Sequence, residues 1–72
     1  MKIKSGKYTH YKGNQYEVIE TALHSETLEE LVVYRALYGE RRLWVRPATM
    51  WSELVEHNGQ MVIRFTKNDL QD

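Results

Sequence analysis

Apolar and polar residues alternate in short runs along this chain, and turn-forming residues separate the runs. The densest apolar run lies between His24 and Pro47. Within it, the segment 31–34 (Leu-Val-Val-Tyr) is β-branched and aromatic, which is typical of a strand. Thr27 followed by Glu30 is a capping-box pattern and Gly39 stands where a helix would end, so a helix is the alternative interpretation. The pattern as a whole favours strands.

A second apolar run, from Gln15 to His24, matches the downstream run and predicts a long antiparallel hairpin. The four residues Ser25 to Leu28 would close it. This loop fixes the expected cross-strand partners: Tyr16 with Leu37, Val18 with Arg35, Ile19 with Tyr34, Glu20 with Val33, Thr21 with Val32 and Ala22 with Leu31. Both faces of such a hairpin are partly apolar. We therefore expect either a bulge near Ile19 and Glu20 that bends the hairpin across a barrel, or a face that meets a partner.

The remaining elements follow from local turn signals. The expected elements are a strand over Lys7 to Tyr11, a turn at Lys12 to Asn14, a turn at Gly39 to Arg42, a strand over Leu43 to Arg46 ended by Pro47, and an irregular or 3₁₀ turn from Ala48 to Trp51. A helical turn over Met50 to Glu56, capped by Thr49, is the alternative for the next segment.

The dipeptide Asn58-Gly59 predicts a type I′ hairpin turn, because both of its residues tolerate positive φ. The turn sets three expected pairs: Val55 with Val62, Leu54 with Ile63, and Glu53 with Arg64. Side chains alternate along a strand, so Met61, Ile63 and Phe65 would share the core face with Leu54, while Val62, Arg64 and Thr66 would face outward.

These elements predict an all-β fold, a small five-stranded antiparallel meander that curls into a partly closed, SH3-like barrel. The expected domain organisation is a flexible arm over residues 1–6, a single barrel domain over 7–66 and a polar tail over 67–72. With 72 residues, the chain has room for one small core.

Charge and cysteine content narrow the classes of function. Ten basic residues balance ten acidic residues, so the chain as a whole does not attract nucleic acid or an anionic membrane. There is no cysteine, which excludes disulfides and thiolate chemistry and fits a cytoplasmic location. No apolar run is long enough for a signal peptide or a membrane span, so we expect no membrane partner.

Several segments of the chain together resemble a known family. They are Tyr8-Thr9-His10-Tyr11-Lys12-Gly13, Tyr16-Glu17-Val18, His24-Ser25-Glu26-Thr27, the run from Glu30 to Gly39, Leu43-Trp44-Val45-Arg46-Pro47 and Arg64-Phe65. Over Lys7 to Phe65 the chain resembles the small bacterial family named domain of unknown function 1653. The resemblance implies a compact SH3-type barrel and brings no activity, cofactor or site with it. The chain departs from the family pattern at Leu28, where Gly is common, and at Ile63, where Pro often stands.

No motif in the sequence supports catalysis. His10, His24 and His57 lack cysteine partners and metal-ligand spacing, so we expect no metal site. His24-Ser25-Glu26 contains the residue types of a hydrolase triad, but three consecutive side chains at a strand end cannot converge, and turn capping explains them better. The glycines fit turns instead of a phosphate-binding loop. We expect no cofactor and a protein that is not an enzyme.

Aromatic and arginine residues exceed what so small a core can absorb, and these types dominate binding hot spots. We therefore expect a non-catalytic binding module that recognises a peptide or protein partner. The candidate partner-binding residues are Tyr34, Tyr38, Trp44, Arg46, Arg35 and His24. Trp44 is expected to be mainly a core residue, and Arg35 to pair with Glu20. A nucleic-acid-binding barrel that uses Arg41, Arg42 and Arg46, and a self-associating structural domain, are the two alternatives.

Overall fold

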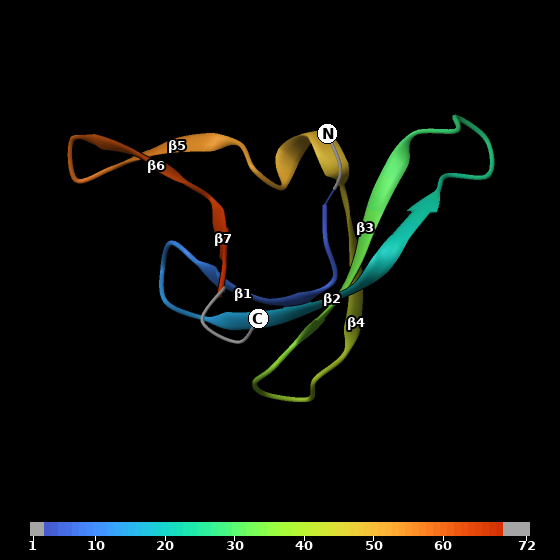
Figure 1. Cartoon of the computed structure of the whole chain (residues 1–72), viewed down its shortest axis with the longest axis horizontal. Coiled ribbons are helices and arrows are strands. Elements are labelled where there is room, and N and C mark those ends of the chain that lie inside the picture. Colours follow the sequence, from blue (N-terminus) through green and yellow to red (C-terminus); the bar gives the residue numbers. More distant parts are fainter. Residues whose placement is uncertain (1–2, 69–72) are drawn as a thin grey trace.

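The computed structural model describes residues 3–68 and contains only strands and one short 3₁₀ helix. Five strands form one antiparallel sheet in the order β4-β3-β2-β1-β7, and two form a separate hairpin. The first sheet curls round a core without closing, and the hairpin extends as an arm from its rim (Figure 1). The elements are β1 (Gly6–His10), β2 (Gln15–Leu23), β3 (Glu30–Ala36), β4 (Leu43–Pro47), η1 (Ala48–Met50), β5 (Leu54–His57), β6 (Gln60–Ile63) and β7 (Phe65–Lys67).

The all-β antiparallel prediction is therefore confirmed, although the chain divides into more strands than the five expected. Seven strands form where five were expected, and one of the additional divisions falls at Arg64, an irregular residue that separates β6 from β7. Past this point β7 leaves the hairpin and pairs with β1, with Phe65 opposite His10. The helical alternatives for residues 28–38 and 50–56 are excluded, since β3 and β5 occupy them.

The long hairpin β2–β3 has the predicted register next to its loop and a different one beyond a bulge. Ala22 faces Leu31 and Glu20 faces Val33, as expected. The ladder then shifts between Val18 and Glu20, so that Ile19 has no partner in it. The predicted bulge is confirmed, and it bends the strands sharply.

Below the bulge the predicted pairs are wrong by one residue. Val18 faces Tyr34 instead of Arg35, and Tyr16 faces Ala36 instead of Leu37. Because β2 has one extra residue at the bulge, Val18 lies on the same face of the sheet as Thr21. Both side chains point to the concave face of the sheet. The slip also removes the expected pairing of Ile19 with Tyr34.

The loop between β2 and β3 has the expected length. The His24 amide donates to the Glu29 carbonyl at 2.8 Å, which leaves four residues outside the ladder. The side chain of His24 also caps the turn, because its Nδ1 accepts hydrogen bonds from the amides of Glu26 at 3.1 Å and Thr27 at 3.3 Å. Leu28, where the resemblance expects Gly, has a positive φ of 63°.

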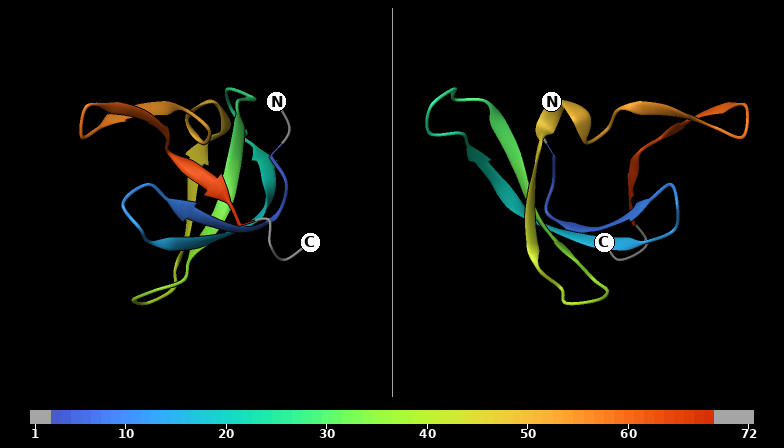
Figure 2. Two further views of the ribbon diagram at one scale, coloured as in Figure 1. Left: turned by 60° about the vertical axis from the view of Figure 1, so that its left-hand side comes forward. Right: turned by 180° about the vertical axis from the view of Figure 1, so that it is seen from behind.

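The β5–β6 hairpin confirms the pairs predicted from Asn58-Gly59, with Leu54 opposite Ile63. Both turn residues have positive φ, 55° and 80°. Its predicted core face is wrong, because Leu54, Met61 and Ile63 are all about half exposed or more. The hairpin stands away from the sheet, so only β7 returns to the core (Figures 1 and 2).

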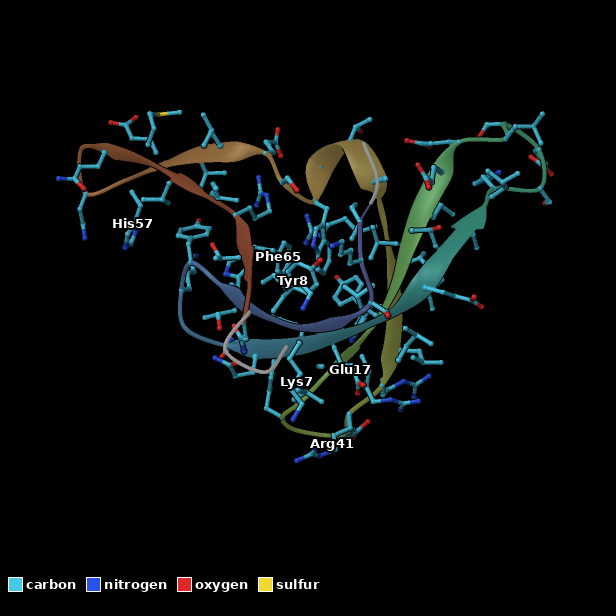
Figure 3. All side chains as sticks on the ribbon, viewed as in Figure 1. Lys7, Tyr8, Glu17, Arg41, His57 and Phe65 are labelled. Carbon is cyan, nitrogen blue, oxygen red and sulfur yellow. The ribbon has the colours of Figure 1, made fainter. Side chains whose placement is uncertain are left out.

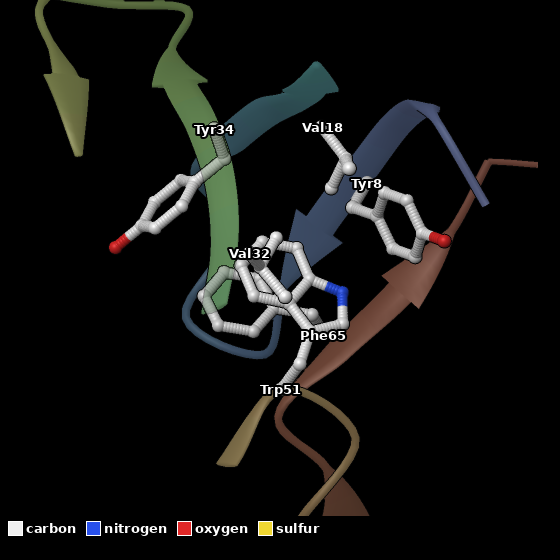
Figure 4. Close-up of a cluster of buried hydrophobic side chains, with 6 residues drawn as sticks. All are labelled: Tyr8, Val18, Val32, Tyr34, Trp51 and Phe65. Atoms are coloured by element: carbon white, nitrogen blue, oxygen red, sulfur yellow. The ribbon is translucent and has the colours of Figure 1, made fainter. Parts of the chain in front are cut away.

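The core is small and mostly aromatic. Trp51 is completely buried and its ring lies flat on Phe65, with centroids 3.8 Å apart (Figure 4). The turn η1 places Trp51 there, as a single 3₁₀ turn between β4 and β5. The buried side chains come from both ends of the chain and from its middle: Tyr8, Val18, Val32, Tyr34, Ala36, Trp51 and Phe65.

Both ends of the described chain contact this domain. Ile3 packs against the core and the Tyr8 hydroxyl donates to the Lys4 carbonyl at 2.8 Å. Gly6 already belongs to β1, and Lys67 still belongs to β7. The rest of the expected arm and tail, residues 1–2 and 69–72, lies outside the described residues. Within residues 3–68, no helix has the length and apolar character needed to cross a bilayer.

Candidate functional site

Strand β4 forms one edge of the curled sheet and carries three consecutive exposed apolar side chains. Leu43, Trp44 and Val45 are 52%, 55% and 59% exposed. Strand β3 covers one side of β4, and no strand in the described part of the chain pairs with its other side. Seen from behind, β4 runs down the outside of the molecule from η1 to the turn that precedes it (Figure 2).

The backbone of β4 offers unused hydrogen-bonding groups along this edge. The Ala36 amide donates to the Arg42 carbonyl at 3.3 Å, which marks these residues as a hydrogen-bonded pair. Pairs alternate in an antiparallel ladder, so Trp44 is the next residue bonded to β3. The N–H and C=O groups of Leu43 and Val45 therefore point away from β3. This edge has two free donors and two free acceptors within one short segment.

The two ends of the free edge are sharply defined. At its start, Arg41 has a left-handed φ of 56°, which interrupts the extended backbone. At its end, Pro47 has no amide to donate. The usable edge is therefore the segment from Arg42 to Arg46.

The two faces of β4 differ in chemistry. Trp44 faces Tyr34 and Arg46 faces Val32, and because Tyr34 and Val32 are buried, this is the concave face. The opposite, convex face carries Leu43 and Val45. Arg42, Trp44 and Arg46 thus alternate on one face, with apolar residues between them on the other.

The exposed Trp44 corrects the expectation that it belongs to the core. The sheet ends at β4, so nothing in the described residues lies beyond Trp44 to cover it. Instead, the indole forms one wall of a small hollow of about 160 Å³ beside the turn 39–42. The hollow is lined by Ala36, Tyr38, Gly39, Glu40, Arg41, Arg42 and Trp44.

Tyr38 is held in this hollow by a second tyrosine. Its hydroxyl lies 2.8 Å from that of Tyr16, and the two rings meet edge to face. Burial first, and then the hydrogen bond with Tyr38, raise the pKa of Tyr16 to about 12. The Tyr16 hydroxyl therefore stays neutral at physiological pH, and its hydrogen bond fixes the aromatic face of Tyr38 beside Trp44.

Arg46 enters the concave side of the sheet. Its guanidinium lies 5.5 Å from the centre of the Phe65 ring, at cation–π distance. Its Nε is buried and has no hydrogen-bond partner among the described residues. No described carboxylate lies within salt-bridge distance of Arg46, whereas the neighbouring Arg64 pairs with Glu53 at 3.0 Å.

His10 lies close to these arginines. Its ring contacts Phe65 edge to face at 4.8 Å. Burial lowers the pKa of His10, and the positive charges of Arg64, Arg46 and Lys12 lower that pKa further. Three positively charged side chains, Arg64, Arg46 and Lys12, therefore act on His10.

The six candidate residues do not form one site. Tyr38, Trp44 and Arg46 lie on or beside β4, whereas Tyr34 is 7% exposed and belongs to the core. His24 serves the far end of the β2–β3 hairpin, where it caps the turn as the sequence predicted.

Arg35 does not pair with Glu20. The bulge places Glu17 opposite Arg35 in place of the expected neighbour. The guanidinium Nη1 donates instead to the Arg41 carbonyl at 2.8 Å. Arg35 thus fixes the turn that precedes β4, and Figure 3 shows Arg41 at the tip of that turn.

Leu43 and Val45 were not among the predicted site residues. The signal that could have found them is a short strand that is apolar at three consecutive positions and ends at Pro47. A strand with one solvent-exposed face alternates apolar and polar residues. Three consecutive apolar residues therefore indicate that both faces of the strand make apolar contacts. Arg42, predicted only for a nucleic-acid site, joins them because the register places it beside Trp44.

Two other hollows lie away from β4. One of about 350 Å³ lies past the Pro47 end of the strand and has three carboxylates on its rim, from Glu29, Glu30 and Glu53. The other, of about 420 Å³, lies between the β1–β2 turn and β6, and His10 and Tyr11 line part of it. Among residues 3–68, no three His, Cys, Asp or Glu side chains are grouped as metal ligands would be.

Comparison with known proteins agrees with the resemblance seen in the sequence. The model of the family described as protein of unknown function (DUF1653) matches residues 6–67. A crystal structure of a DUF1653 protein from Bordetella bronchiseptica is 33% identical and superposes with a TM-score of 0.82. The match covers 89% of this chain and 85% of that one. No curated protein matches the chain.

Proposed function

The chain belongs to the DUF1653 family, and we propose that it is a non-catalytic binding module that takes an extended segment of a partner protein along the edge of β4. One observation carries the proposal: the edge strand β4 combines free backbone groups at Leu43 and Val45 with three exposed apolar side chains. An extended peptide can add to such an edge as a further strand, with main-chain hydrogen bonds for affinity and side-chain contacts for specificity.

The residues along this edge support the interpretation that it binds a partner, and not merely that it is exposed to solvent. Proteins usually protect an edge strand with charges, prolines or bulges along its length, because an open apolar edge aggregates. Around β4 the protecting features stand only at the two ends of the edge: Arg41 and Arg42 come before Leu43, and Arg46 and Pro47 follow Val45. The segment between them is left open, as a recognition strand requires.

The aromatic residues beside the edge support the same function. Tyr38 and Trp44 form a hollow next to the strand, where an apolar side chain of the added segment would be covered on both sides. Tyr16 holds Tyr38 in place through its hydroxyl, so this hollow is ordered before a partner arrives. The cysteine-free sequence supports a cytoplasmic location for the module.

The test is selection of peptides from a displayed random library on the immobilised domain, followed by binding to a backbone-blocked variant. Val45→Pro removes one outward N–H while leaving the hydrogen bonds between β4 and β3 in place. We expect selected peptides to bind Val45→Pro at least about tenfold more weakly than the wild type, a loss of about 1.4 kcal/mol. Val45→Thr keeps the N–H and is the matched control.

Urea unfolding of the three proteins checks that Val45→Pro remains folded. If the library yields no binding peptide, or if the peptides bind Val45→Pro as tightly as Val45→Thr, the β4 edge is not the binding site.

A further inference from the structure

The register of β4 also indicates which partner segment fits. Arg42, Trp44 and Arg46 occupy the concave face of the strand, and Leu43 and Val45 the convex face. In an added strand, residues two apart share a face and lie beside one of these two rows. The order of charged and apolar residues on β4 therefore predicts the order of residues in a strand that pairs with it.

We propose, resting on the proposed function, that the ligand of β4 is an acidic peptide in which two carboxylate residues flank three apolar ones. The carboxylates would lie beside Arg42 and Arg46, and the central apolar residue beside Trp44. The remaining two apolar residues would lie on the convex face with Leu43 and Val45. Because the pattern is symmetric, it holds for either direction of the added strand.

The two arginines are available for such a ligand. No carboxylate of the described residues lies within salt-bridge distance of Arg42 or Arg46. The guanidinium of Arg46 lies 5.5 Å from the centre of the Phe65 ring, and its charge is not matched by a carboxylate of the described residues. An incoming carboxylate would pair with guanidinium groups that the domain itself leaves unpaired, in the charge-assisted geometry that arginine favours.

A second copy of this chain fits the same edge poorly. If β4 paired antiparallel with itself, Leu43 of one copy would face Val45 of the other, and Arg42 would face Arg46. Like charges directly opposite one another destabilise a strand pair. The acidic peptide replaces both of these repulsive pairs with attractive ones.

The surface beyond β4 also limits the length of the acidic peptide. Past Pro47 the surface changes sign, because Glu29, Glu30 and Glu53 surround the hollow there. A longer run of acidic residues would meet these carboxylates and be repelled. The favoured segment is therefore limited to the length of the free edge, from Arg42 to Arg46.

The experiment uses two synthetic capped peptides, Glu-Val-Leu-Val-Glu and Lys-Val-Leu-Val-Lys, each titrated into the labelled domain and followed by amide chemical shifts. We expect the acidic peptide to shift the amides of residues 42–46 and to bind at least about tenfold more tightly than the basic one at low salt. The variant Arg42→Glu should remove most of this preference. Arg41→Glu, one residue before the free edge from Arg42 to Arg46, is the matched control and should keep the preference.

The outcomes separate the two proposals. Equal binding of both peptides, abolished in each case by Val45→Pro, would overturn the acidic preference while supporting strand addition. Stronger binding of the basic peptide would overturn the acidic preference as well. Binding of neither peptide, together with a library that yields no ligand, would overturn both proposals. A dimer in light scattering that Val45→Pro dissociates would show that a second copy is the occupant, contrary to the inference.

Discussion

Trp51 and Phe65 stack face to face at the centre of the molecule, with ring planes only 2° from parallel. Trp51 is delivered by η1 and Phe65 by β7, so this contact joins the segment after β4 to the last strand. Tyr34 and Tyr8 each meet the Trp51 ring edge to face, at 5.0 Å and 5.4 Å. The stack is therefore the point at which the curled sheet is held together.

We predict that Phe65→Leu lowers the free energy of unfolding by about 1–3 kcal/mol, because it removes the stacked pair and leaves a partly filled space. A domain of this size has only about 3–5 kcal/mol in total, so the loss should be plain in urea unfolding. Trp44→Leu is the matched control: it also removes an aromatic ring, but from an exposed position, and should change stability by less than about 0.5 kcal/mol. Equal losses would show that the two rings have the same role.

Mild acid should destabilise the protein through His10. Its pKa is lowered in the folded state, chiefly by burial and then by Arg64, Arg46 and Lys12, so folding favours the neutral ring. The stabilising contribution is present above the ordinary histidine pKa of about 6.5 and is lost as pH falls below it. His10→Gln should therefore lose less stability than the wild type between about pH 7.5 and 5.5 in urea unfolding. The same loss in both proteins would contradict this assignment.

Alkaline pH should act through Tyr16. Its pKa is raised to about 12, so its contribution to stability is complete below the ordinary tyrosine value of about 10 and disappears as pH rises toward 12. Ultraviolet titration should show one tyrosine that ionises last. In Tyr38→Phe, which removes the hydroxyl 2.8 Å away, that last ionisation should occur at lower pH. If the last ionisation occurs at the same pH in Tyr38→Phe as in the wild type, the hydrogen bond does not form in solution.

Leu28 should be a site where substitution stabilises the protein. It has φ of 63° and is 69% exposed, so it combines left-handed backbone with an apolar side chain in water. Leu28→Gly should raise the free energy of unfolding by about 0.5–1 kcal/mol, because Gly adopts this conformation without the steric cost. Ser25→Gly in the same loop is the control, and should be neutral or slightly destabilising. Thermal unfolding that shows the opposite order would contradict this account of the loop.

The sequence was sufficient for elements whose signals are local. The Asn58-Gly59 turn, the His24 turn and the 3₁₀ turn before Trp51 all depend on conformations that a few neighbouring residues determine. The alternation of apolar residues near the β2–β3 loop similarly fixed the pairing of Ala22 with Leu31. Local chemistry and hairpin geometry explain these successes.

The failures arose where distant contacts decide the structure. The bulge at Ile19 could be expected, but its effect on every later pair depends on how the sheet curls round Trp51. The core face of β6 was misassigned, since Arg64 interrupts the strand and only Phe65 turns inward. Trp44 was expected inside because several of the aromatic rings of so small a protein must belong to its core. It is exposed because β4 is the edge of the sheet, and strand order cannot be read from the sequence pattern.

The open edge of β4 is tested most directly by amide hydrogen exchange, residue by residue, in the isolated domain. The amides of Leu43 and Val45 should exchange quickly, whereas those of Trp44 and Arg46, which face β3, should be protected. Addition of a β4-binding peptide should slow Leu43 and Val45 and leave Trp44 and Arg46 protected. If Leu43 and Val45 are already as protected as Trp44 in the free, monomeric domain, the edge is not open and strand addition at β4 is wrong.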